Sequence, residues 1–229
     1  MNQPKRSKYN PNHILCYGSR YKGFDMWKQN APYIDQYLDK LYEVFQRSFY
    51  NHPRTLVVCF DLHLPFYSQH SLVRNPITEF IENIKRGIKS YQLKQQREKK
   101  RIHHTQIEYV AKVEQTIESP LEHYHVVLFL NKDTFYNVGN LSHEDRTQLG
   151  RIIRHAWLKV HGISTDSTAA LLHASNPVSY SLEGPLTCLN KQHEVVFKRI
   201  NYLCKEATTK YQGRHQSFYS SNAKNKAPA

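Results

Sequence analysis

The chain has 229 residues, and its 32 Lys and Arg against 19 Asp and Glu leave a formal net charge of +13 at pH 7. Aromatic residues make up 12% of the chain, too many for an intrinsically disordered protein, so a packed core is expected. No apolar run approaches the roughly 18 residues that span a bilayer, and the basic start lacks the apolar stretch of a secretory signal. We therefore expect a cytoplasmic protein with no membrane partner, whose positive charge binds a polyanion such as nucleic acid.

The N-terminal third predicts an arm, a helix and a strand. Residues 1–30 are polar and are expected to form a loosely ordered arm. After Pro32, apolar residues recur at helical spacing until His52-Pro53 ends the helix. Residues 55–64 are a compact, β-favouring run that predicts a buried strand.

The middle of the chain predicts a second helix, a hairpin and a third helix. Asn75-Pro76 fits a cap followed by a first-turn proline, and the helix after it has a basic end at residues 94–101. Residues 107–115 and 123–130 predict two strands that turn at Ser119-Pro120. Ser142 is then expected to open a helix that Gly162 ends.

The last third predicts short strands at 169–173 and 178–182, a final helix from Glu194 to Lys205, and a polar tail over 211–229. From residue 54 the order is strand, helix, strand, strand, helix, strand, helix. This order predicts an α+β fold with residues 31–210 as a single domain. The expected architecture is a ferredoxin-like split β-α-β sandwich, with a central antiparallel sheet flanked by helices.

The most informative segment is the predicted strand that begins with His123 and His125. Strand alternation places both imidazoles on one face, where they can chelate a single divalent ion. Two histidines leave such a site under-filled, so a further oxygen ligand is needed. Glu114 on the partner strand is the natural candidate, with Asp61 and His63 on the first strand as alternatives. The chain has 14 histidines, so a His-x-His pair can also arise by chance.

Tyr202 and Lys205 form a second candidate pair, because positions three apart share one face of a helix. A tyrosine that attacks a phosphodiester must lose a proton from a pKa near 10. An adjacent cation stabilises both the phenolate and the charge that develops on phosphorus. Taken alone, the pair fits an ordinary amphipathic helix better, with the tyrosine packed and the lysine solvated.

Together, the two elements resemble the HUH endonuclease superfamily of rolling-circle replication initiators. In that superfamily a His-U-His strand with an apolar U is followed by a Tyr-x-x-Lys helix. More narrowly, the stretches FDLHLP, HYHVVLFLNKD and YLCKEATTKY look like the inovirus-type replication protein family of filamentous phages and integrated bacterial elements. The resemblance covers roughly residues 54–220.

The resemblance implies a site-specific nickase that initiates rolling-circle replication of a phage or mobile element in a bacterial host cell. Tyr202 would attack a scissile phosphate in single-stranded or extruded origin DNA, forming a 5′-phosphotyrosine and releasing a 3′-hydroxyl for a host polymerase. His123, His125 and Glu114 would hold Mg²⁺ or Mn²⁺, which orients the phosphate. Lys205 would assist electrostatically.

Lys198, Arg199 and Lys210 are expected to hold the DNA backbone beside this site. Glu206 stands four positions after Tyr202, which indicates a single-tyrosine enzyme. No Gly-rich phosphate loop is present in the sequence, so a host helicase is the expected unwinding partner. Two alternatives stay open: a transposase or relaxase with the same chemistry, and a non-catalytic nucleic-acid-binding module or repressor that stacks bases on aromatic side chains.

Overall fold

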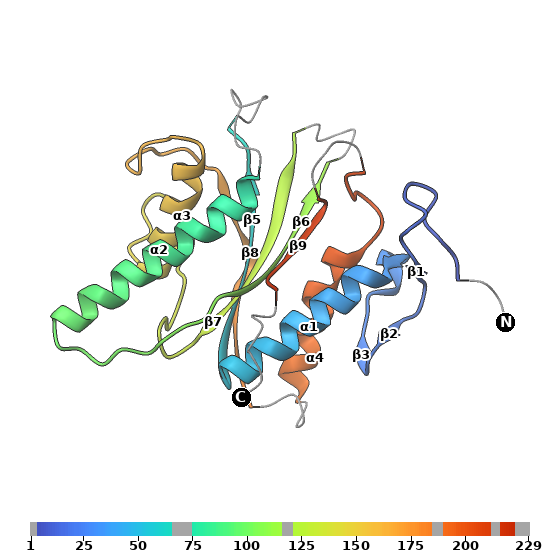
Figure 1. The fold of residues 1–229 in the computed structure, drawn as a ribbon, viewed down its shortest axis with the longest axis horizontal. Helices are drawn as coiled ribbons and strands as arrows, with labels where there is room; N and C mark the ends of the chain where they lie inside the picture. The colour runs from blue at the N-terminus through green and yellow to red at the C-terminus, as the bar shows by residue number, and fades with distance from the viewer. Residues whose placement is uncertain (1–3, 66–74, 116–120, 185–189, 212–215, 223–229) are drawn as a thin grey trace.

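A computed structural model of the chain describes residues 4–65, 75–115, 121–184, 190–211 and 216–222. Its centre is a five-stranded antiparallel sheet in the order β8-β5-β7-β6-β9. The strands are β5 (Arg54–His63), β6 (Glu108–Glu114), β7 (His123–Asn131), β8 (Leu172–Glu183) and β9 (Phe218–Ser220). Helices α2 (Pro76–Arg97) and α3 (Gln148–Val160) lie on one side of the sheet, and α1 (Asp35–Asn51) and α4 (Lys191–Ile200) lie on the other (Figure 1). The predicted α+β class, with a central antiparallel sheet flanked by helices, is confirmed.

Side-chain alternation along β5 builds two separate cores. Leu56, Val58 and Phe60 pack with α2 and α3, whereas Val57 and Cys59 pack with α1 and α4. A central strand covered on both faces is apolar at nearly every position, which is why this run showed no polar alternation.

Two helices connect strands that are not neighbours. α2 joins β5 to β6 with β7 lying between them, and α3 joins β7 to β8 with β5 lying between them. β6 and β7 are antiparallel neighbours, as the hairpin prediction requires. The turn predicted at Ser119-Pro120 lies outside the described residues.

The prediction of a loosely ordered N-terminal arm is wrong for its described part. β1 (Leu15–Cys16) pairs with β4 (Tyr33–Ile34), and β2 (Arg20–Tyr21) pairs with β3 (Phe24–Asp25). A 3₁₀ turn, η1 (Lys28–Asn30), lies between β3 and β4. Phe24 is only 1% exposed and stacks on Phe197 of α4 with ring centroids 4.3 Å apart. Apolar burial therefore holds this polar-looking segment against α1 and α4.

Two predicted elements in the middle of the chain have different boundaries. α3 begins at Gln148 and not at Ser142, because the Thr147 hydroxyl accepts a backbone N–H of the first turn and caps the helix there. The strand predicted at 178–182 lies within one longer strand, β8, which pairs with β5 across a register shift. The strand predicted at 169–173 overlaps β8 only at Leu172 and His173.

The C-terminal region also differs from prediction. The last helix ends at Ile200, and a 3₁₀ turn, η3 (Asn201–Cys204), follows it. The Asn201 side chain donates a hydrogen bond to the Asp25 carbonyl, which ties this turn to the N-terminal segment. The expected polar tail contains β9, which pairs with β6 and so extends the sheet. Burial of the Phe218 side chain, which is fully buried, stabilises this edge strand. Within the described residues, no helix has both the length and the apolar character needed to cross a bilayer.

Candidate active site

One face of the sheet changes from apolar to polar where β5 ends and β7 begins. On β5 this is the face that buries Val57 and Cys59 under α1 and α4, and the next side chain on it is Asp61. The strand registers then define two cross-strand rows: Asp61, His125 and Lys112 in one, and His63, His123 and Glu114 in the next. Residues from three strands are thus brought together by pairing alone.

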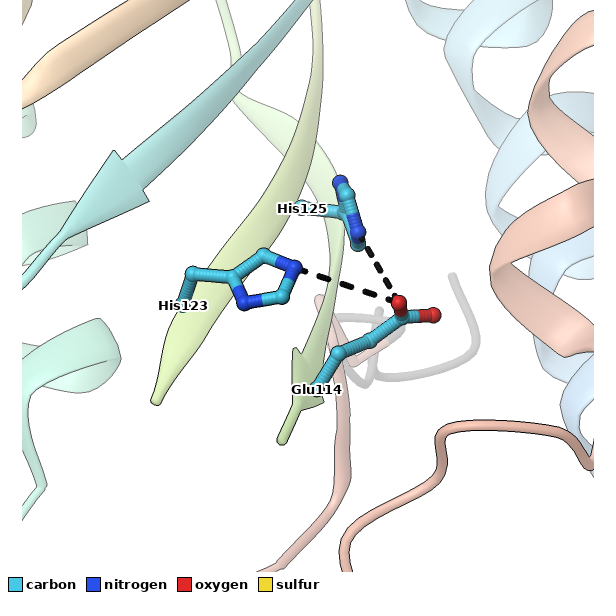
Figure 2. Close-up of side chains that lie close together, drawn as sticks. All are labelled: Glu114, His123 and His125. Atoms are coloured by element: carbon cyan, nitrogen blue, oxygen red, sulfur yellow. Dashed lines mark ion pairs between the residues drawn. The ribbon is translucent and has the colours of Figure 1, made fainter. Parts of the chain in front are cut away.

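Glu114, His123 and His125 converge on one point. Their candidate ligand atoms all lie within 4.8 Å of one another. Glu114 Oε2 lies 3.2 Å from His125 Nε2 and 3.9 Å from His123 Nε2, and Figure 2 shows both rings turned toward the carboxylate. Two imidazole nitrogens and a carboxylate oxygen suit Mn²⁺ or Zn²⁺ and leave further positions open. The donor set therefore fits a divalent metal ion.

Asp61 and His63, the alternative third ligands, occupy different positions. Asp61 Oδ1 accepts a hydrogen bond of 2.5 Å from His125 Nδ1, which leaves Nε2 of that ring facing Glu114. A carboxylate on the far nitrogen is the usual support for a metal-binding histidine. The His63 ring stacks on His123 with centroids 5.9 Å apart. The geometry favours Glu114 as the third ligand and gives Asp61 an orienting role.

The local environment sets the charges of these three side chains. Burial raises the pKa of Glu114, but His125 and Lys112 outweigh this effect and hold the pKa below its ordinary value. Burial and the neighbouring His125 lower the pKa of His123. Burial lowers the pKa of His125, but Asp61 and Glu114 outweigh this and raise it. These shifts favour the metal-binding forms of Glu114 and His123, and a metal would compete with a proton for His125 Nε2.

Tyr202 lies beside this cluster, in the 3₁₀ turn η3 and not in an α-helix. Its ring meets the His125 ring edge-on with centroids 5.2 Å apart. The Arg199 guanidinium lies 5.2 Å from the Tyr202 ring centroid, and Lys205 Nζ lies 5.5 Å from it. Burial, followed by the charge of Asp61, raises the pKa of the phenol well above its ordinary value, and Arg199 opposes this. The phenol is therefore protonated at pH 7.

Two lysines face the opposite oxygen of the Glu114 carboxylate. Lys112 Nζ lies 3.0 Å and Lys205 Nζ 3.4 Å from Glu114 Oε1. Lys112 is fully buried, and it also donates hydrogen bonds to the backbone carbonyls of Lys205 and Ala207, at 2.8 and 3.3 Å. Burial lowers the pKa of Lys112 to about 8, despite Glu114. Lys112 thus ties the metal-site strand to the turn that carries Tyr202.

Sequence reasoning missed Lys112. The available signal was a single lysine between the apolar residues Val110, Ala111 and Val113, two positions before Glu114 and so on the same face. A lysine at such a position is rarely buried without a partner. The carbonyls that bind it come from a distant turn, so the sequence carried no sign of this contact.

The predicted DNA-binding cations do not form one group. Arg199 lies at the site over Tyr202, as described above. Lys198 instead lies over the Trp27 ring, 4.5 Å from its centroid, and Lys210 forms an ion pair with Glu122. Of these three residues, only Arg199 is placed beside the candidate nucleophile.

The sequence profile of the YagK/YfjJ C-terminal domain matches residues 19–221, which include the whole site. The chain belongs to this family. It is 24% identical to the Escherichia coli K12 protein YagK over 184 residues, which cover 77% of this chain and 87% of YagK. It is also 24% identical to YfjJ of the same strain over 188 residues, which cover 78% of this chain and 89% of YfjJ. Both relatives carry the name "uncharacterized protein", and no solved structure matches the chain. The YagK/YfjJ family membership thus assigns no activity, and the functional argument rests on the site.

Proposed function

We propose that this protein is a metal-dependent DNA endonuclease that uses Tyr202 as its nucleophile and initiates rolling-circle replication of a phage or mobile element. The observation that carries this proposal is the placement of Tyr202 against the cluster of Glu114, His123 and His125. A divalent ion held by that cluster would polarise a scissile phosphate and reduce its negative charge.

In the proposed reaction, the Tyr202 oxygen bonds to phosphorus while the bond from phosphorus to the 3′-oxygen breaks. The phenol proton leaves to solvent, and the departing 3′-oxygen takes up a proton as a hydroxyl. The product is a 5′-phosphotyrosine with a free 3′-hydroxyl, which a host polymerase can extend. The covalent link retains the bond energy for a later rejoining step.

Electrostatics supports these roles. The carboxylates of Asp61 and Glu114 carry two negative charges, and the ammonium groups of Lys112 and Lys205 carry two positive charges. The charges of these four side chains therefore cancel. A bound divalent ion would make the site net positive and attract a phosphate. Arg199 and Lys205 lie on the Tyr202 ring and would stabilise the phenolate as it forms.

The fold is also consistent with the proposal. In the strand order β8-β5-β7-β6, each crossover helix connects strands separated by one neighbour, which is the pattern of the ferredoxin-like split β-α-β sandwich. Glu206 in place of a second tyrosine supports a single-tyrosine enzyme. The predicted partners, single-stranded or extruded origin DNA and a host helicase, belong to this proposal.

The test is a search for a covalent protein–DNA adduct. Purified full-length protein is incubated with Mn²⁺ and labelled single-stranded oligonucleotides that tile both strands of the DNA flanking its gene. We expect a denaturation-resistant adduct with a subset of oligonucleotides, and mass spectrometry of the digested adduct should place the nucleotide on Tyr202. EDTA should abolish adduct formation, because the phosphate is then no longer polarised.

Two tyrosine variants localise the chemistry. Tyr202→Phe should form no adduct, whereas Tyr42→Phe, which changes a half-buried tyrosine of α1 on the same core, should react as the wild type does. An adduct that persists in Tyr202→Phe would show that the nucleophile is a different residue. Salt-sensitive DNA binding without any adduct across the whole oligonucleotide set would favour the non-catalytic binding module.

A further inference from the structure

A groove of about 840 Å³ lies between α2 and α3. These two helices cover the face of the sheet opposite to α1 and α4, which lie on the side of the candidate active site (Figure 1). The helices approach closely at its floor. A Cβ atom at Gly87 of α2 would lie 2.9 Å from Cγ2 of Ile152 on α3, so the glycine permits this contact. Closely packed helices thus form the walls of the groove, and the proposed cleavage chemistry does not use it.

Exposed cations line both walls of this groove. Arg86 and Lys94 stand eight residues apart on α2, and Arg151 and Lys159 stand eight residues apart on α3. Spacings of four and eight residues keep side chains on one helix face, about 12 Å apart over two turns. No acidic residue occurs among the described residues that line the groove.

These cations are largely free to meet a ligand. Within the described part of the chain, Arg86, Arg151 and Lys159 form no ion pair, and Lys94 lies 4.0 Å from the exposed Glu98. The buried Asn83 supports the α2 wall, because its amide donates to the Ala156 carbonyl of α3 while its oxygen accepts from Arg86.

Burial lowers the pKa of His155 on the α3 wall, and the charges of Arg151 and Arg154 lower it further, against an opposing effect of Asp166. The sign of the potential follows from the lining itself, whose described residues include four cations and no carboxylate. The potential in the groove is therefore positive.

We propose that the α2–α3 groove is a second DNA-binding surface that holds the sugar-phosphate backbone of duplex DNA. Packed helices lie about 8–10 Å apart, so the four cations mark two rows at a separation comparable to the roughly 6–12 Å grooves of a duplex. A single strand would present only one row of phosphates.

The lining also argues against a single-strand site. Single-strand binding surfaces offer exposed aromatic rings on which bases stack. The lining offers no Phe or Trp among its described residues, and its one tyrosine, Tyr91, is itself stacked on Phe135 with centroids 5.4 Å apart. The groove thus offers charge and shape without a stacking platform, which suits contacts to a duplex backbone.

The test compares two variants of equal charge in the full-length protein. The groove variant is Arg86→Gln/Arg151→Gln/Lys159→Gln. The control is Lys5→Gln/Lys8→Gln/Lys28→Gln, which removes three exposed lysines from the N-terminal segment. Fluorescence anisotropy measures binding to a labelled duplex of arbitrary sequence and to a labelled oligo(dT) strand, between about 50 and 200 mM salt.

The groove variant should bind duplex about 10- to 100-fold more weakly at low salt, and the slope of log affinity against log salt should fall by about 2 to 3. The control should change that slope by less than about 1. An Arg86→Lys/Arg151→Lys variant should restore binding, because the phosphate contacts need charge and not the guanidinium shape. Unfolding in urea should be unchanged, since all substituted side chains are exposed.

Three results would overturn the proposal: unchanged duplex binding in the groove variant, an equal loss in the control, or a loss as large for oligo(dT) as for duplex. Adduct formation on single-stranded DNA should persist in the groove variant. This readout separates the two proposals, because the groove can fail while the Tyr202 chemistry holds, and the reverse.

Discussion

The orienting role of Asp61 leads to a quantitative prediction for Asp61→Asn. The substitution keeps the side-chain shape but replaces the charge-assisted hydrogen bond to His125 Nδ1 with a neutral one, at a contact where both side chains are largely buried. Hydrogen bonds to charged groups contribute about 1.5–3 kcal/mol and neutral ones about 0.5–1.5 kcal/mol. The difference of about 1–1.5 kcal/mol corresponds to an approximately tenfold loss of Mn²⁺ affinity.

The assay is a Mn²⁺ titration followed by the EPR signal of the free ion. It is run near pH 8, because Asp61 raises the pKa of His125 and proton competition would otherwise mask part of the change. Asp133→Asn is the matched control, since Asp133 is paired with Arg54 at the far end of β5. Equal Mn²⁺ affinity in Asp61→Asn and Asp133→Asn would refute the argument that Asp61 orients the ligand ring.

Three further predictions concern stability. Lys112→Met should lower the free energy of unfolding by about 3–5 kcal/mol in urea, because it leaves the buried Glu114 carboxylate without its nearest cation; a loss under about 1 kcal/mol would contradict this role. Gly87→Ala should destabilise the fold by up to about 2 kcal/mol, because crowding against Ile152 exceeds the gain in helix propensity; a gain of about 1 kcal/mol would show that propensity alone governs the site. Among the described residues, burial lowers the pKa of seven histidines, such as His52, whose Nε2 accepts the Gln106 N–H, and these outnumber His125, whose pKa is raised. Through these seven, the folded state binds fewer protons than the unfolded chain. Stability should therefore be present above pH 6.5 and fall below it, and a melting temperature that is equal or higher at about pH 5.5 than at about pH 7.5 would contradict this sign.

Elements with strong local signals were predicted well. The apolar run at 55–64 is β5, and Asn75-Pro76 stands where α2 begins. Their patterns span many residues, and at α2 the apolar stripe and the first-turn proline favour the same helix. The N-terminal segment and β9 were missed because each is held by few residues. Phe24 gains its burial from rings of α1 and α4, and Phe218 from Tyr37 of α1 and the pairing of its strand with β6, and no local periodicity records such contacts.

The candidate site also has one part that the sequence determines and another that only the folded structure decides. The two-residue period of a strand places His123 and His125 on one face, and the sequence by itself determines this relation. Which carboxylate joins them depends on strand register, since a slip of one residue in β6 would turn Gln115 toward the rings and Glu114 away. The pairing of Glu114 with His123 decides this point, as the pairing of Asp61 with His125 decides the orienting contact. The position of Tyr202 likewise depends on η3 and the buried Lys112, because contacts between distant segments exist only once the chain has folded.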